Sequence, residues 1–113
     1  MVKAEVIEAH ESEFPNPLKL AKGQLVDLKE HSTEWPGWIF AVAEDGNSGW
    51  IHKSYLIIDG SSGKIGVDYD ATELNVDSGE KLDVLDTKSG WCLCQKLSGE
   101  IGWVPERNLS IKR

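Results

Sequence analysis

Tryptophan is the residue type with the clearest capacity for binding chemistry in this sequence. Five tryptophans stand among 113 residues. An indole combines a large apolar surface with one N–H donor, which suits it to gripping a partner. Trp35 and Trp38 lie close together in the segment Trp35-Pro36-Gly37-Trp38. Because Trp35 is expected in a loop, we expect its indole to be exposed.

Acidic residues are expected in the loops beside Trp38, namely Glu11, Glu13, Glu30 and Glu34. Carboxylates around an exposed indole would attract and orient a basic peptide. The same residues also fit an ordinary solvated acidic surface. The sequence leaves both interpretations open.

The histidines and cysteines could support metal binding, redox chemistry or titration near neutral pH. His10, His31 and His52 are 21 residues apart, which matches no metal-ligand spacing. His10 and His52 are expected beside Trp38, either as polar surface residues or as a pH-sensitive pair. Cys92 and Cys94 share one face of an expected strand, with Cα atoms roughly 7 Å apart, too far for an easy disulfide. We expect both to be small buried hydrophobes.

Sequence signatures of catalysis are absent. The chain contains no Ser/His/Asp or Cys/His signature, no glycine-rich phosphate loop and no zinc motif. The sequence therefore predicts a protein that is not an enzyme and that needs no cofactor.

The net charge narrows the choice of partner. The chain carries a formal charge of −7, with a pI near 4.9. An acidic protein is poorly suited to nucleic acid or to anionic membranes, which are bound through Lys and Arg. A charged partner is therefore expected to be basic. Residues 1–10 lack the apolar run of a signal peptide, so a cytoplasmic location is expected.

Two Gly-Trp pairs recur at an offset of 53 residues, which indicates an internal repeat. Gly37-Trp38 and Gly49-Trp50 match Gly90-Trp91 and Gly102-Trp103. Two further blocks agree in the same order, so coincidence is a poor explanation. They pair Lys22–Leu28 with Ser78–Leu85, and Ser54–Ile57 with Asn108–Ile111.

The repeats predict short β-strands at hairpin spacing. Trp38–Ala43 and Trp91–Lys96 are apolar, β-prone runs bounded by turn residues, and no segment sustains a helical period. The expected fold class is all-β, with two tandem five-stranded barrels. The expected boundaries are residues 1–58 for the first barrel, 59–63 for a short linker and 64–113 for the second barrel.

At this level of detail the chain resembles SH3 domains, in particular their divergent bacterial-type variants. The second repeat carries Val67–Ala71 as the opening strand and Gly102–Leu109 as the closing segment. The first repeat carries Val6–His10 and Gly49–Leu56 at the same places. The resemblance implies SH3-like barrels with a groove for extended, proline-rich peptides, which are already extended and lose little entropy on binding.

Carried over residue by residue, the resemblance implies two candidate grooves. In the first repeat Trp38 and Tyr55 match the family pattern and His52 takes the place of its proline. In the second repeat Trp91, Pro105 and Tyr69 match. Acids of the RT loop, the long loop beside the groove, would pair with Lys or Arg of the peptide. The predicted partner-binding residues are Glu11, Glu13, Trp35, Trp38, His52, Tyr55, Tyr69, Glu73, Trp91 and Pro105.

The sequence thus predicts a non-catalytic interaction module that binds a protein or peptide, basic or proline-containing, through Trp-centred acidic grooves. One alternative is a structural or assembly protein whose grooves are buried between barrels or subunits. A second alternative is cell-wall or glycan recognition. Exposure of Trp38 and Trp91 in acidic clefts would favour the interaction module over the structural or assembly protein. The oligomeric state is left open.

Overall fold

The regular structure of the described residues consists of β-strands and two short 3₁₀ turns, which confirms the expected all-β class. The computed structural model describes residues 2–12, 17–29 and 36–112. Strand partners divide the chain into two compact units. Unit 1 combines residues 1–15 with residues 72–113, and unit 2 is formed by residues 16–71. Among the residues that the structure describes, no helix is long and apolar enough to cross a membrane.

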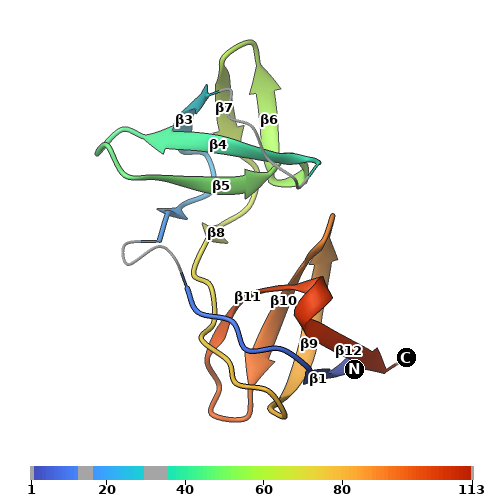
Figure 1. Cartoon of the computed structure of the whole chain (residues 1–113). Coiled ribbons are helices and arrows are strands. Elements are labelled where there is room, and N and C mark those ends of the chain that lie inside the picture. The colour runs from blue at the N-terminus through green and yellow to red at the C-terminus, as the bar shows by residue number, and fades with distance from the viewer. Residues whose placement is uncertain (1, 13–16, 30–35, 113) are drawn as a thin grey trace. The chain divides into compact units, whose positions relative to one another are not determined.

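Unit 1 is an antiparallel five-stranded sheet in the order β11-β10-β9-β1-β12. Its N-terminal strand β1, drawn in blue, lies between the orange and red strands β9 and β12 (Figure 1). A bulge between Leu93 and Cys94 interrupts the register of β10 with β9. The elements are β1 (Val2–Val6), β9 (Lys81–Lys88), β10 (Trp91–Lys96), β11 (Ile101–Pro105), the 3₁₀ turn η2 (Glu106–Asn108) and β12 (Leu109–Lys112).

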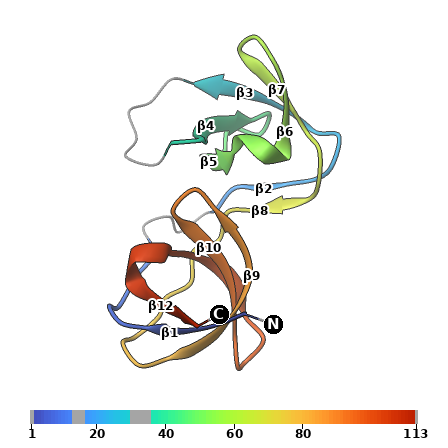
Figure 2. The ribbon, with the colours of Figure 1, turned by 90° about the vertical axis from the view of Figure 1, so that its right-hand side faces the viewer.

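Unit 2 repeats this arrangement with the strand order β5-β4-β3-β7-β6. A separate two-stranded ladder joins β2 to β8 (Figure 2). The elements are β2 (Lys19–Leu20), β3 (Leu25–Lys29), β4 (Trp38–Ala43), β5 (Ser48–His52), the 3₁₀ turn η1 (Lys53–Tyr55), β6 (Leu56–Asp59), β7 (Ser62–Ile65) and β8 (Tyr69–Asp70).

The two repeats exchange their first strands. In unit 1, Val6 of β1 lies opposite Leu109 of β12. In unit 2, Ile65 of β7 lies opposite Leu56 of β6, and Leu56 and Leu109 are equivalent at the offset of 53 residues. Strand β1 therefore completes the barrel of the second repeat, and β7 completes the barrel of the first.

This pairing corrects the expected domain boundaries. Residues 59–63 were expected to be a flexible linker between barrels at 1–58 and 64–113. The structure instead places Asp59 opposite Ser62, with the two-residue turn Gly60-Ser61 between β6 and β7. The composition of a linker and that of a tight β-hairpin overlap, because both favour glycine and small polar residues. The chain crosses between units near residues 15 and 71 instead.

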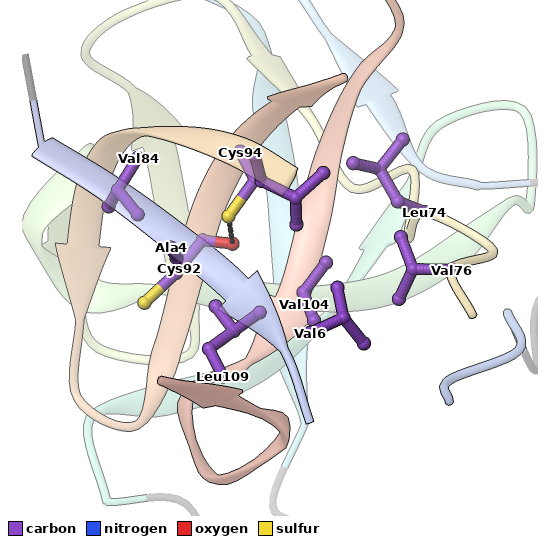
Figure 3. Close-up of a cluster of buried hydrophobic side chains, with 10 residues drawn as sticks. Ala4, Val6, Leu74, Val76, Val84, Cys92, Cys94, Val104 and Leu109 are labelled. Carbon is purple, nitrogen blue, oxygen red and sulfur yellow. Dashed lines mark hydrogen bonds between the residues drawn. The ribbon is translucent and has the colours of Figure 1, made fainter. Parts of the chain in front are cut away.

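Each unit has its own apolar core. In unit 1 the side chains of β1, β9, β10 and β11 converge on one cluster (Figure 3). Cys92 and Cys94 belong to it as free, buried thiols, which confirms their interpretation as small hydrophobes. Burial raises the pKa of the Cys94 thiol to about 12. The cluster consists of Ala4, Val6, Leu74, Val76, Leu82, Val84, Cys92, Cys94, Val104 and Leu109, with Ile111 packed against it.

Candidate partner-binding site

In unit 2, two pairs of aromatic and imidazole rings are formed by residues of β4, β5, η1 and β8. Trp38 lies directly opposite His52 of β5, with ring centroids 5.4 Å apart in an edge-to-face arrangement. Tyr55 follows on η1 and stands 5.4 Å from Tyr69 of β8. We call these four residues the unit 2 cluster. The sequence predicted that Trp38, His52 and Tyr55 would come together, and they share this unit.

His52 has a structural task at the position where the family pattern has proline. Its Nδ1 accepts a hydrogen bond from the Ser54 backbone N–H at 3.2 Å and lies 2.8 Å from Ser54 Oγ. The imidazole thus caps the first turn of η1. A side-chain acceptor satisfies an N–H group that the turn itself leaves unpaired. The same 3₁₀ turn contains Tyr55, whose ring lies 5.4 Å from that of Tyr69.

Most of the unit 2 cluster is buried, including the Trp38 indole, whose exposure would have favoured an interaction module over a structural protein. Trp38 retains only 8% of its accessible surface, and Tyr69 and His52 are similarly buried. The Tyr69 hydroxyl donates to the Trp50 carbonyl at 2.7 Å. The tyrosine that matches the family's opening strand is therefore anchored inside unit 2. Tyr55 is half-buried and is the member of the cluster that reaches the surface most.

In unit 1 the equivalent place holds Trp91, His10 and Glu73, which we call the unit 1 cluster. Trp91 begins β10 and lies opposite Pro105 of β11, as Trp38 lies opposite His52. The His10 ring packs edge-on against the Trp91 indole at 5.8 Å. His10 Nε2 lies 2.7 Å from Glu73 Oε1, and these side chains are 14% and 11% exposed. Trp91 is half-buried, and Pro105 is buried.

Strand exchange decides the membership of both clusters. The sequence placed Tyr69 with Trp91 in the second repeat, whereas the structure places Tyr69 in unit 2 with Tyr55. It also expected His10 beside His52, but His10 belongs to unit 1. Each cluster therefore combines residues of both repeats. A strand pattern identifies a strand without identifying its partner, which is why residue matching within a repeat misassigned these two residues.

The acidic residues predicted to line the grooves are also divided between the two units. Glu11 is exposed and belongs to unit 1, whereas Trp38 belongs to unit 2. Glu73 stays with Trp91, since the Glu73 backbone bridges to Trp103 of β11. In unit 2, Asp70 is exposed and stands 4.0 Å from the Lys19 ammonium. The predicted positions Glu13, Glu30, His31, Glu34 and Trp35 lie outside the described residues.

Asn108 is a further residue of this region that is not among the predicted partner-binding residues. It is buried at the end of η2. Its Nδ2 donates to the carbonyls of Glu8 and Ala9 at 3.1 and 3.2 Å. Its backbone carbonyl accepts from the Ile7 N–H at 2.8 Å. Asn108 thereby ties the segment after β1, which leads to His10, to unit 1.

Replacing Asn108 with alanine is expected to lower the free energy of unfolding by about 1–2 kcal/mol, because two carbonyls lose their donors. Urea denaturation of the full chain measures the change. Ser110→Ala, at an exposed position of the adjoining strand, serves as the control and should change stability by less than about 0.5 kcal/mol. Equal effects of the two substitutions would contradict the anchoring role.

Comparison with known families identifies both repeats. The family described as variant SH3 domain matches residues 3–59. The family described as SH3 domain matches residues 68–106. The first match runs from β1 to β6 and therefore spans both structural units. No curated protein and no solved structure matches the chain significantly.

Proposed function

Because the chain belongs to the SH3 domain family, whose members are generally protein-interaction modules, we propose that it binds a basic segment of a partner protein at the unit 1 cluster. The observation that carries this proposal is the accessibility of Trp91. It is half-buried and packs against His10, whose Nε2 lies 2.7 Å from the Glu73 carboxylate, whereas its equivalent Trp38 is buried. Of the two candidate grooves, the proposal therefore chooses the one that contains Trp91.

The unit 1 cluster has the chemical parts of such a site. Trp91 offers an apolar surface for an extended peptide, and Pro105 lies opposite it in the ladder. The Glu73 side chain is 11% exposed and lies 2.7 Å from His10 Nε2, so a Lys or Arg of the peptide would donate to Glu73 in exchange for the His10 contact. Such charge-assisted bonds are about twice as strong as neutral ones. Exposed Glu11 adds negative charge nearby on the same unit. The net charge of −7 also favours encounter with a basic partner.

The burial of Trp38 supports a second role for unit 2. An indole that is 8% exposed and packed edge-on against His52 offers little surface to a peptide. We infer that the unit 2 cluster is mainly structural, holding the start of β4 against β5 and η1. Non-catalytic binding by unit 1 and a structural role for unit 2 are therefore compatible within one chain.

An arrayed library of unstructured peptides, with proline-containing members bearing Lys or Arg, Asp or Glu, or no charge, tests the proposal. Peptides bearing Lys or Arg are expected to bind the full-length protein and to bind more weakly as salt rises. Trp91→Ala should reduce affinity at least about 30-fold, as expected for a hot-spot residue. Glu73→Gln should abolish the preference for Lys and Arg over neutral peptides.

Two comparisons keep this test specific. Leu97→Ala removes an apolar side chain that is 91% exposed in the β10–β11 turn, outside the cluster. This variant should bind like the parent protein. Trp91→Phe retains an aromatic ring and should recover part of the affinity that Trp91→Ala loses. Equal binding of acidic and basic peptides, or equal losses in Trp91→Ala and Leu97→Ala, would refute the proposal.

A further inference from the structure

The strand exchange requires an explanation, because both repeats offer a strand for the same place. Strand β1 in unit 1 and strand β7 in unit 2 occupy equivalent positions: β1 lies between β9 and β12, and β7 lies between β3 and β6. The alternative is that each repeat closes on itself, with β1 in the first barrel and β7 in the second. Two kinds of contact in the structure favour the observed pairing over this alternative.

The first is the turn between β6 and β7. Asp59 pairs with Ser62, so just Gly60 and Ser61 connect the two strands. Gly60 has φ of 62°, in the left-handed region that tight hairpin turns use. Closing a two-residue loop costs little entropy compared with bringing β1 to β6 across about fifty intervening residues. The hairpin therefore fills the place beside β6 with β7 and leaves β1 to find another edge.

The charges across the ladders also depend on the pairing. Glu5 of β1 lies opposite Lys81 of β9 and pairs with its ammonium. This ammonium lowers the pKa of Glu5 below its ordinary value. Lys3, two residues before Glu5, pairs with Asp83 of β9 but lies directly opposite Lys112 of β12. The residue of β7 equivalent to Glu5 is Lys64, because it holds the same place between the neighbouring strands.

Closure of each repeat on itself would redistribute these charge contacts. Lys64 would then face Lys81, and like charges directly opposite one another destabilise an antiparallel pair. Lys3, however, would leave Lys112 and lie opposite Asp27 and Asp59, the present partners of Ser62. Both arrangements therefore contain attractive and repulsive pairs, and the charges alone do not select the pairing.

The second is side-chain size. Gly63 of β7 holds the place that Ala4 holds in β1, since both lie in the row beside the core. A Cβ at Gly63 would meet Leu56 Cδ2 at 3.3 Å and Leu28 Cδ2 at 3.4 Å. Ala4 would therefore be crowded in unit 2, and Gly63 would leave a gap where the Ala4 methyl now packs.

We propose that the two-residue turn Gly60-Ser61 and the small residue Gly63 of β7 select the exchanged pairing, and thereby determine which residues meet in the two clusters. His10 reaches Trp91 because β1 enters unit 1, and Tyr69 reaches Tyr55 because β7 enters unit 2. This inference concerns strand pairing and holds whether or not the unit 1 cluster binds a peptide.

Two pairs of engineered cysteines in the full chain report the pairing. Lys3→Cys with Lys112→Cys joins residues that are opposite in the exchanged arrangement. Lys3→Cys with Asp59→Cys joins residues that would be opposite if the first repeat closed on itself, because Asp59 is the equivalent of Lys112 at the offset of 53. Directly opposite residues of antiparallel strands lie within disulfide range. Cys92 and Cys94 are buried and should not interfere.

Without further changes, oxidation should link the first pair and leave the second pair reduced. The test variant then inserts a twelve-residue Gly/Ser segment between Gly60 and Ser61 and exchanges the two small residues by Ala4→Gly and Gly63→Ala. In the monomeric fraction of this variant, the ratio of the two cross-links is expected to shift at least about tenfold toward the second pair, the change that 1.4 kcal/mol of altered preference produces.

A matched insertion separates the role of this turn from that of any added loop. The same Gly/Ser segment placed between Leu97 and Ser98, in the exposed β10–β11 turn, should leave the cross-link ratio unchanged. An unchanged ratio in the Gly60-Ser61 variant would overturn the proposal that the turn and the size of Gly63 select the pairing. Cross-linking of the second pair without the insertion would overturn the exchange itself.

Discussion

Replacement of Gly102 by alanine is expected to lower the stability of unit 1 by about 2–3 kcal/mol, as overpacking of a close contact does. A Cβ at Gly102 would lie 2.8 Å from the Thr72 carbonyl oxygen and 2.9 Å from Leu74 Cγ. That carbonyl cannot easily retreat, since it accepts a hydrogen bond from the Trp103 N–H at 2.8 Å. The Leu74 N–H is held by the Trp103 carbonyl at 3.0 Å. The clash therefore strains a segment that is fixed on both sides.

The equivalent glycine of unit 2 provides the matched control. At Gly49 the nearest atom to an added Cβ is Leu18 Cβ at 3.1 Å, a side-chain contact without a backbone clash. Gly49→Ala should therefore cost about 1 kcal/mol. Urea denaturation followed by circular dichroism gives both values. A smaller loss for Gly102→Ala than for Gly49→Ala would contradict the packing described for Thr72 and Leu74.

The clash also bears on the candidate site, because Glu73 stands between Thr72 and Leu74. Displacement of this segment should weaken the His10–Glu73 contact of 2.7 Å. If the unit 1 cluster binds basic peptides, Gly102→Ala is then expected to reduce binding under conditions in which the protein remains folded. Gly49→Ala should leave binding unchanged, since Gly49 and Leu18 belong to unit 2.

The sequence was sufficient to predict the fold class and the repeat but not the strand partners. Gly-Trp pairs and apolar runs identified strands such as β4 and β10 close to their observed bounds. Strands β1 and β7, however, satisfy the same alternating pattern, with Val6 and Ile65 inward, so periodicity fits either pairing. The deciding features are a two-residue turn, which resembles a linker in composition, and a single small residue, Gly63, which stands in β7 where Ala4 stands in β1.

The candidate site was predictable in its parts and not in its assembly. Trp38, His52 and Tyr55 share one repeat and one unit, because the β4–β5 hairpin and η1 that carry them are local in sequence. The contact of His10 with Glu73 joins residues 63 positions apart, and it exists because β1 crosses to unit 1. The sequence left open whether Trp38 and Trp91 are exposed or buried, since burial depends on tertiary packing and not on the local sequence.

Replacement of Ile65 by alanine is expected to destabilise unit 2, and not the unit that contains Trp91, by about 2–5 kcal/mol. Ile65 is almost completely buried in β7. Its N–H donates to the Gln24 carbonyl at 2.9 Å, and its own carbonyl accepts from the Gly23 N–H at 2.7 Å. Removing the side chain therefore leaves a cavity between elements that all belong to residues 16–71.

Amide hydrogen exchange of the full chain, followed by NMR, locates the loss. In Ile65→Ala, the amides of β3 and β4 should lose protection while those of β9 and β10 keep it. Val6→Ala, the equivalent change in β1, should produce the reverse pattern. If the repeats instead closed on themselves, Ile65→Ala would weaken β9 and β10, and Val6→Ala would weaken β3 and β4. The two substitutions therefore distinguish the pairings by opposite results, because each inward side chain stabilises the barrel that its strand completes.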